Sequence, residues 1–229
     1  KDAIQKTKVA IIGAGFGGLA MAIRLLQSQI NDFVILEKTN DVGGTWRENQ
    51  YPGAACDVQS HMYSLSFAPK TDWSKRYAEA DEIFTYIQDI TEQYKLKDYC
   101  KFNHEVTHAQ FDENRNVWTV EFKDQPTLEA QFVIFASGPL HVPQIPHIKG
   151  IEKFKGKVFH SSKWEHDYDL NGKSVASIGT GGSAIQYIPE IAPEVKQLYV
   201  FQRTAAWVIP RDERKYSQLS KTLFKASNI

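Results

Sequence analysis

Cysteine is scarce in this sequence, with only Cys56 and Cys100 among 229 residues. Two cysteines do not make a disulfide framework, which excludes the small disulfide-stapled secreted domains and leads us to expect a reducing, cytoplasmic location. The start of the chain has no signal-peptide core and no initiator Met, so we expect a trimmed or partial chain.

An excess charge is missing as well, since 27 Lys and Arg residues balance 27 Asp and Glu residues. No charge field therefore favours nucleic acid or anionic lipid as a partner. No stretch approaches the ~20 apolar residues that a membrane helix needs. The hydrophobic fraction of 42% supports a core, and the length suits one large or two small domains.

The first clear pattern is a strand, a glycine turn, a helix and a second strand. An apolar run at 9–12 leads into Gly-x-Gly-x-x-Gly at 13–18, and apolar residues then recur at helical spacing. The second buried strand, 33–36, ends at Glu37, which follows Gly13 by 24 positions (37 − 13). Glycines of ordinary turns are the alternative, but the surrounding elements favour a dinucleotide-binding unit.

The residues of this turn have separate expected roles. Gly13 makes the tight turn, Gly15 lets the main chain approach a pyrophosphate, and Gly18 allows close packing of helix and strand. The helix N-terminus would hold the pyrophosphate, and Glu37 would accept hydrogen bonds from ribose hydroxyls. A strand at 132–136 that closes on Ser137 and Gly138 would bring more main chain to the same pyrophosphate.

A long glycine-broken stretch, 41–57, reads as a loop rather than a strand or helix. A solvated surface loop is one explanation. However, Trp46, Tyr51 and Tyr63 are costly to leave in water, so we expect a loop folded over a flat aromatic ligand. We interpret Cys56 as a small buried filler, because no activating base is evident. After this loop, apolar residues at 83–94 predict an amphipathic core helix.

His-Glu-x-x-His at 104–108 matches a zinc-protease pattern, which works only on a helix. Here three strand-like runs follow one another, at 106–111, 117–122 and 128–136. On a strand the two histidines would lie roughly 13 Å apart, too far for one zinc ion. We therefore predict no metal site but a three-stranded meander, whose Val106 could offer main-chain amides to an adenine.

The second half repeats the pattern, with a strand at 175–178, a glycine turn at 179–184 and a strand at 198–201. Ala184 stands where the third Gly would be. Arg203 follows Gly179 by 24 positions (203 − 179), the same interval that separates Glu37 from Gly13. A carboxylate there suits bare ribose hydroxyls, whereas Arg can bind a 2′-phosphate through a charge-assisted contact. The sequence therefore predicts a non-phosphorylated dinucleotide in the first site and NADP in the second, with a solvated strand-end cation as the alternative for Arg203.

Between the two turns lies the sequence Phe-x-Gly-x-x-x-His-x-x-x-Trp at 154–164, with His160 and Trp164 at its end. With this motif, the chain resembles the class B flavoprotein monooxygenases of the Baeyer–Villiger type. Gly-Gly-Thr-Trp at 43–46, Tyr-Pro-Gly-Ala at 51–54 and Phe-Gln-Arg-Thr at 201–204 are similar to the same family, and together they span nearly the whole chain. Glu165 departs from the family's usual Pro or Asp.

This resemblance implies an α/β fold with two Rossmann-like dinucleotide-binding domains. The implied domains are residues 1–145 for FAD, with the small meander, and residues 146–229 for NADPH, incomplete. It also implies that NADPH reduces the flavin, that a C4a-peroxyflavin forms with O2, and that a ketone becomes an ester or lactone. Asp57 would hold an Arg beside the flavin, and that Arg would lie beyond residue 229. His160 would be a residue of the cofactor interface, although a purely structural histidine is the alternative.

The expected contacts divide between the two cofactors. For FAD they are Gly13, Gly15, Phe16, Gly17, Gly18, Glu37, Lys38, Gly44, Thr45, Trp46, Asp57, Val58, Tyr63, Val106, Ser137 and Gly138. For NADPH they are Gly179, Thr180, Gly181, Ser183, Ala184, Gln186, Arg203 and Thr204. The expected catalytic residues are Asp57 and His160.

Two other functions remain open from the sequence. One is a heteroatom-oxidising or N-hydroxylating flavin monooxygenase, against which Trp164 argues. The other is a non-catalytic, truncated nucleotide-binding fragment. The tail after residue 212 stops before a second doubly wound domain would be complete, so we expect the chain to be a fragment.

Overall fold

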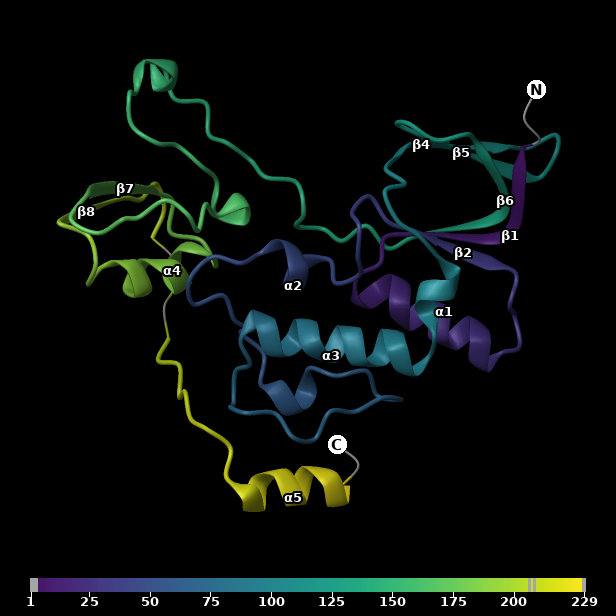
Figure 1. Ribbon diagram of the computed structural model, residues 1–229, viewed down its shortest axis with the longest axis horizontal. Helices are drawn as coiled ribbons and strands as arrows, with labels where there is room; N and C mark the ends of the chain where they lie inside the picture. The colour runs from purple at the N-terminus through teal and green to yellow at the C-terminus, as the bar shows by residue number, and fades with distance from the viewer. Residues whose placement is uncertain (1–3, 206, 208, 228–229) are drawn as a thin grey trace. The chain divides into compact units, whose positions relative to one another are not determined.

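A computed structural model describes residues 4–205, 207 and 209–227 of the chain. It separates into two compact units: Lys1–Arg47 with Phe84–His141, and Glu48–Ile83 with Val142–Ile229. Each unit therefore combines segments that are distant in the sequence (Figure 1). The predicted boundary at residue 145 between an FAD and an NADPH domain concerns cofactors, and it stays a prediction.

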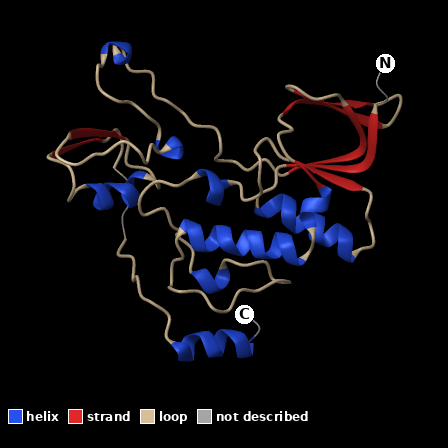
Figure 2. Cartoon of the chain, in the orientation of Figure 1, coloured by secondary structure: helices blue, strands red, loops and turns tan. Residues whose placement is uncertain are grey.

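The first unit is built on a six-stranded mixed sheet with the strand order β3-β2-β1-β6-β5-β4. Its strands are β1 (Gln5–Ile12), β2 (Phe33–Leu36), β3 (Cys100–Lys101), β4 (Val106–Asp112), β5 (Val117–Phe122) and β6 (Leu128–Phe135). β1 pairs in parallel with both β2 and β6, whereas β4, β5 and β6 are antiparallel neighbours (Figure 2). The predicted α/β class with a meander is confirmed for this unit.

Helix α1 (Phe16–Gln27) covers one face of the parallel strands (Figure 1). Its buried residues, Gly18, Leu19, Ala22 and Ile23, recur at helical spacing, so a single stripe faces the sheet. The opposite face holds a second core, to which β1, β2, β5 and β6 contribute Ala10, Val34, Leu36, Val120, Leu128 and Ala130. Every residue of β2 is buried, as expected for a strand covered on both faces.

The His-Glu-x-x-His pattern does not form a helix. His104 precedes β4 and His108 lies on it, so the strand predicted for this stretch is confirmed. His104 Nδ1 is 2.7 Å from the carbonyl oxygen of Phe102, which can only accept, so Nδ1 carries the proton. The His104 ring also lies edge-on against Phe122, at 5.4 Å between centroids. Local packing therefore accounts for this histidine.

The second unit contains a two-stranded parallel sheet of β7 (Ser174–Ile178) and β8 (Gln197–Phe201), joined by α4 (Ala184–Ile191). Three short 3₁₀ turns also belong to it, at Ser60–Met62, Ile151–Lys153 and Ser161–Lys163. The C-terminal helix α5 (Gln218–Ser227) completes it. Segment 48–83 groups with these elements, which its place in the sequence did not indicate.

One local expectation needs correction, and three elements add detail to the predicted pattern. The stretch 41–57 is not all loop, because one helical turn, α2 (Thr45–Glu48), follows the glycine pair. The helix after the first glycine turn ends at Gln27, and Gln29 just beyond it has a left-handed φ of 60°. The two-residue strand β3, which pairs with β2, is too short to show a period. The amphipathic helix expected at 83–94 is confirmed as α3 (Ala80–Gln93), and a further 3₁₀ turn, Leu96–Tyr99, precedes β3.

Candidate dinucleotide-binding sites

The first glycine turn joins β1 to α1 at the carboxyl edge of the parallel strands. Gly13 has a φ of 107°, and an added Cβ would lie 2.5 Å from the carbonyl oxygen of Ala136. At Gly18, an added Cβ would lie 1.9 Å from the carbonyl oxygen of Gly13. Both positions therefore exclude a side chain, for the reasons that the motif predicts: a tight turn and a close helix–strand approach.

A second pair of glycines brings the following loop against this turn. The amide of Gly43 donates to the carbonyl oxygen of Ala14 at 3.0 Å. A Cβ on Gly44 would lie 3.0 Å from the Cα of Gly15, and Gly44 has a φ of 54°. The two main chains thus lie side by side with no side chain between them, which leaves amides near the N-terminus of α1, where helix geometry favours an anion.

Glu37 lies beside the same turn and is 7% exposed. Its Oε2 accepts from the amide of Ala14 at 2.9 Å, and its Oε1 accepts from the amide and hydroxyl of Thr39 at 2.9 and 2.8 Å. Oε2 carries only this one described hydrogen bond, so it retains a lone pair for a further donor. The carboxylate is therefore fixed and still able to accept a hydroxyl.

The remaining predicted FAD contacts of the first unit have these surroundings. The amide of Ala136 donates to the carbonyl oxygen of Ile12, which places Ser137 next to Gly13. Val106 pairs with Phe122 next to a β-bulge in β4 and packs on the meander core. Thr45 and Trp46 lie on α2, and the Lys38 side chain is exposed. The structure thus brings the glycine turn, Glu37, Gly44 and Ser137 together.

Asp57, Val58 and Tyr63 belong to the second unit, so the structure defines their local surroundings only. Asp57 and Val58 are exposed, and Tyr63 is half-buried. The amide of Val58 donates to the Sγ of Cys56 at 3.3 Å. Burial raises the pKa of the Cys56 thiol, which keeps it protonated. Cys56 is 3% exposed, in agreement with its interpretation as a buried filler.

The second glycine turn joins β7 to α4. Gly179 has a φ of 102°, and its amide donates to the carbonyl oxygen of Phe201 at 2.8 Å. Gln202 Nε2 donates to the Thr180 hydroxyl at 2.9 Å, so the ends of β7 and β8 lie together. Arg203 follows directly and is exposed; within the described residues no acidic side chain pairs with it. The exposed guanidinium of Arg203 can therefore bind an anion from solvent.

The side chain of Gln186 is already engaged. Its Nε2 donates to the carbonyl oxygen of Ala55 at 2.9 Å, and its Oε1 accepts from the amide of Ala55 at 3.2 Å and from the Tyr51 hydroxyl at 3.0 Å. An added Cβ on Gly53 would lie 2.9 Å from the main-chain oxygen of Gln186, so loop and helix are in close contact. Sequence reasoning missed this contact, because its partners lie 131 to 135 positions apart.

The linking motif is held by local contacts. Trp164 packs on Phe159 and Tyr187 with centroid distances of 5.3 Å to each, and the Tyr187 hydroxyl hydrogen-bonds that of Ser177 at 2.7 Å. His160 Nδ1 accepts from the amide of Ser162 at 3.1 Å, which leaves the proton of a neutral ring on Nε2. His160 thus caps a short turn, and the structure describes no substrate-facing role for it.

Two charged side chains of this segment also meet. Lys157 forms an ion pair with Glu165, the residue that departs from the family pattern. The pair links the two ends of the motif, so Glu165 has a structural partner here.

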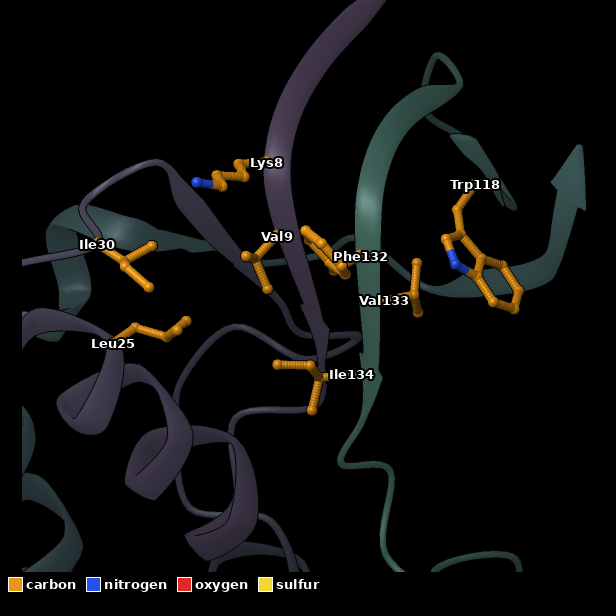
Figure 3. A pocket seen from close by; sticks show the side chains of 8 residues that line it. All are labelled: Lys8, Val9, Leu25, Ile30, Trp118, Phe132, Val133 and Ile134. Carbon is orange, nitrogen blue, oxygen red and sulfur yellow. The ribbon is translucent and has the colours of Figure 1, made fainter. Parts of the chain in front are cut away.

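An apolar hollow on the first unit is a poor candidate for a nucleotide. Leu25, Ile30, Trp118, Phe132 and other apolar side chains line it, and Lys8 brings the one charged side chain of its lining (Figure 3). A dinucleotide needs several donors for its phosphates, which this lining does not supply. The two glycine turns therefore remain the predicted nucleotide sites.

Comparison with known proteins identifies the family. A family model described as pyridine nucleotide-disulphide oxidoreductase matches residues 10–224. A "Baeyer-Villiger monooxygenase" of Streptomyces coelicolor is 47% identical over 222 residues, which cover 97% of this chain and 43% of that protein.

Solved structures agree. "Oxidized steroid monooxygenase bound to NADP" aligns with a TM-score of 0.90 and 37% identity, covering 98% of this chain and 44% of that one. "OTEMO complex with FAD and NADP" aligns with a TM-score of 0.91 and 33% identity, covering 97% and 43%. The chain thus spans less than half the length of the relatives that it matches. No helix in the described ranges is long and apolar enough to cross a bilayer.

Proposed function

The chain belongs to the pyridine nucleotide-disulphide oxidoreductase family, within it to the class B flavin monooxygenases of the Baeyer–Villiger type, and we propose a function on that premise. It is the N-terminal part of an NADPH- and O2-dependent enzyme that inserts oxygen next to a ketone carbonyl. Its fold consists of two Rossmann-like nucleotide-binding domains, the second incomplete. We propose FAD for the first glycine turn and NADPH for the second, and a cytoplasmic location.

The first turn fits FAD through its geometry. Gly15 and Gly44 approach each other without side chains, and α1 has no side-chain cap at its N-terminus. A pyrophosphate there would take the place of a cap. Glu37 offers a fixed carboxylate to ribose hydroxyls.

The second turn fits NADPH through Arg203. At the same interval after the turn, Glu37 in the first site is replaced by an exposed guanidinium without a described acidic partner. A guanidinium binds a 2′-phosphate through charge-assisted hydrogen bonds, and a carboxylate would repel it. This contrast between Glu37 and Arg203 is the single observation that carries the assignment of the two cofactors.

When bound, the flavin supplies the redox chemistry, taking hydride from NADPH and activating O2. The described residues bind and orient. The main chain around Gly13 and Ser137 would face the FAD pyrophosphate, whereas Thr180, Gly181 and Ser183 would face that of NADPH. We propose that Asp57 orients a cation from the rest of the protein beside the flavin, and that His160 keeps the linking segment in place.

Visible spectroscopy of the purified 229-residue chain, before and after anaerobic NADPH, tests the proposal. Yellow protein that loses its colour with NADPH supports both cofactor sites. Colourless protein that takes up no FAD contradicts a flavin site within this chain. On the full-length protein, a panel of ketones, sulfides and amines then separates ketone oxygenation from heteroatom oxidation. NADPH oxidation without an oxygenated product would favour a non-catalytic role.

A further inference from the structure

Inside the second unit, the segment 211–216 forms main-chain hydrogen bonds with the loop 74–80. The amide of Arg76 donates to the carbonyl oxygen of Arg214 at 2.9 Å, and the amide of Tyr216 donates to the carbonyl oxygen of Ser74 at 3.0 Å. An ion pair between Arg76 and Asp212 adds a side-chain contact. Residues 211–216 therefore form a strap along one edge of this loop.

The other edge of the same loop carries Cys56. The amide of Cys56 donates to the carbonyl oxygen of Ala78 at 2.9 Å, and the amide of Ala80 donates to the carbonyl oxygen of Ala54 at 2.8 Å. Ser60 adds a further link between the segments 54–60 and 78–80, because its hydroxyl accepts from the amide of Ala78 at 2.8 Å. The strap 211–216, the loop 74–80 and the segment 54–60 thus lie side by side and are joined by hydrogen bonds.

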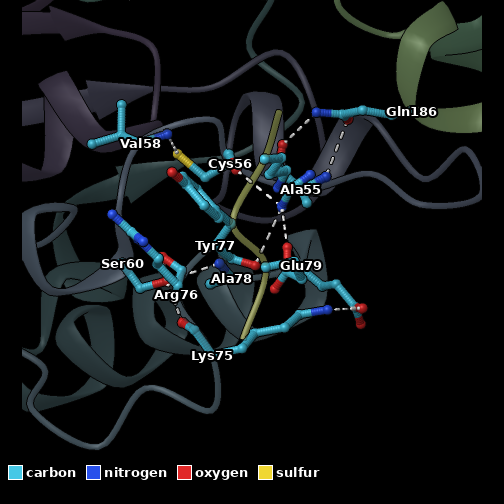
Figure 4. A network of polar contacts seen from close by, with 12 residues as sticks. Ala55, Cys56, Val58, Ser60, Lys75, Arg76, Tyr77, Ala78, Glu79 and Gln186 are labelled. Carbon is cyan, nitrogen blue, oxygen red and sulfur yellow. Dashed lines mark hydrogen bonds and ion pairs between the residues drawn. The ribbon is translucent and has the colours of Figure 1, made fainter. Parts of the chain in front are cut away.

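Two side chains fix the peptide groups that lead into Asp57. Gln186 binds both the amide and the carbonyl oxygen of Ala55 (Figure 4). Arg211 contacts the next residue, Cys56: its Nη2 lies 3.4 Å from the carbonyl oxygen of Cys56 and 3.5 Å from the carbonyl oxygen of Tyr77. These two contacts are long, and the same Nη2 also forms an ion pair with Oε2 of Glu213 at 3.0 Å, so the guanidinium lies beside both carbonyl oxygens and this carboxylate. The guanidinium also lies over the Tyr77 ring, at 4.7 Å from its centroid.

We propose that Arg211 and Gln186 are positioning residues for the turn at 55–58, and that they set the direction in which the Asp57 carboxylate points. Each binds main chain immediately before Asp57, whose own side chain is exposed. This inference rests on the proposed role of Asp57 at the flavin. It also assigns the Gln186 amide to the protein main chain rather than to NADPH.

The chemistry of Arg211 makes the proposal specific. A planar guanidinium has several donors in a fixed fork and stacks on an aromatic ring, whereas Lys has a single mobile ammonium. Arg211→Lys should therefore restore only part of what Arg211→Met removes. Arg214 is the matched control: it lies on the same strap, and the structure describes no hydrogen bond or ion pair of its side chain.

The test uses the full-length protein loaded with FAD. Amide hydrogen exchange in the peptide covering 54–59 should be at least 10-fold faster in Arg211→Met than in Arg214→Met, which should match wild type. The rate at which NADPH bleaches the flavin should fall about 10-fold in Arg211→Met and recover in part in Arg211→Lys. Gln186→Leu should produce the same two changes, and it serves if Arg211→Met does not fold.

The outcomes separate the proposal from its premise. Equal exchange and equal bleaching rates in Arg211→Met and Arg214→Met would overturn the positioning role. Faster exchange with an unchanged bleaching rate would overturn the link to the flavin, and with it the proposal. Wild-type protein that binds no FAD would instead contradict the proposed function, independently of the exchange result.

Discussion

Adjacent glycines at the start of α1 should respond oppositely to the same substitution. At Gly18, an added Cβ would lie 1.9 Å from the carbonyl oxygen of Gly13 and 3.3 Å from the Cγ2 of Ile11. At Gly17, the nearest atom would be the Cβ of Ala136, at an ordinary contact distance of 3.8 Å. The two positions share a helix and differ in what a methyl group would meet.

The magnitudes follow from this geometry. The atom that Gly18→Ala would strike is main chain in a turn that itself has a φ of 107°, so it cannot swing away as a side chain would. Forced packing of this kind costs about 3 kcal/mol. Gly17→Ala meets no obstacle and gains from the better helix propensity of Ala, by up to about 1 kcal/mol.

Equilibrium urea unfolding of the apo chain, followed by far-UV circular dichroism, measures both free energies. We expect Gly18→Ala to be less stable than Gly17→Ala by about 3–4 kcal/mol. The comparison uses the same residue type and the same helix, so differences in the unfolded chain cancel. Equal stability of the two variants would refute the close approach of α1 to the first turn.

Three further predictions concern single side chains. Arg203→Ala should weaken NADPH binding by about 10- to 100-fold and leave NADH binding nearly unchanged, because only the 2′-phosphate contact is lost. Equal losses of affinity in titrations with NADPH and with NADH would contradict a contact between Arg203 and the 2′-phosphate. Desolvation and, secondarily, the charge of Arg76 lower the pKa of His61 below its ordinary value. As the pH drops, His61 is therefore protonated in the unfolded chain before it is protonated in the folded chain, and the free energy of unfolding should fall from about pH 7 to 5. Thermal unfolding across that range should show a smaller slope in His61→Gln, and an identical slope would contradict this assignment. Burial raises the pKa of the Cys100 thiol to about 12, so iodoacetamide should alkylate it in the native chain far more slowly than free cysteine, and comparable rates would contradict its burial.

His61 also reports on how the C-terminal helix is held. Its Nδ1 lies 2.9 Å from the Tyr216 hydroxyl, and its ring stacks on Phe224 at 4.9 Å between centroids. Burial raises the pKa of the Tyr216 hydroxyl, which therefore remains protonated and can donate to a neutral His61. A proton on His61 would disrupt this contact, which gives the pH effect a structural consequence at α5.

Much of the first unit was predictable from the sequence. The run 9–12, the turn 13–18 and Glu37 specify a strand, a tight turn, a helix and an acid, because each step has its own period or its own glycine. The three strands of the meander were also predictable, since β-branched residues and turn residues alternate there at short range. The equal spacing of Glu37 and Arg203 from their turns is likewise a property of the sequence alone.

The tertiary structure decided what lies far apart in the chain. Gln186 binds Ala55 across 131 positions, and Arg211 reaches Cys56 across 155. Hydrogen bonds from a side chain to a main-chain carbonyl leave no trace in local composition, because every non-terminal residue offers the same carbonyl. The sequence determined which residues could meet a nucleotide. Only the fold decided that the Gln186 side chain binds the main chain of Ala55 and the hydroxyl of Tyr51, because the loop 51–55 packs closely on α4.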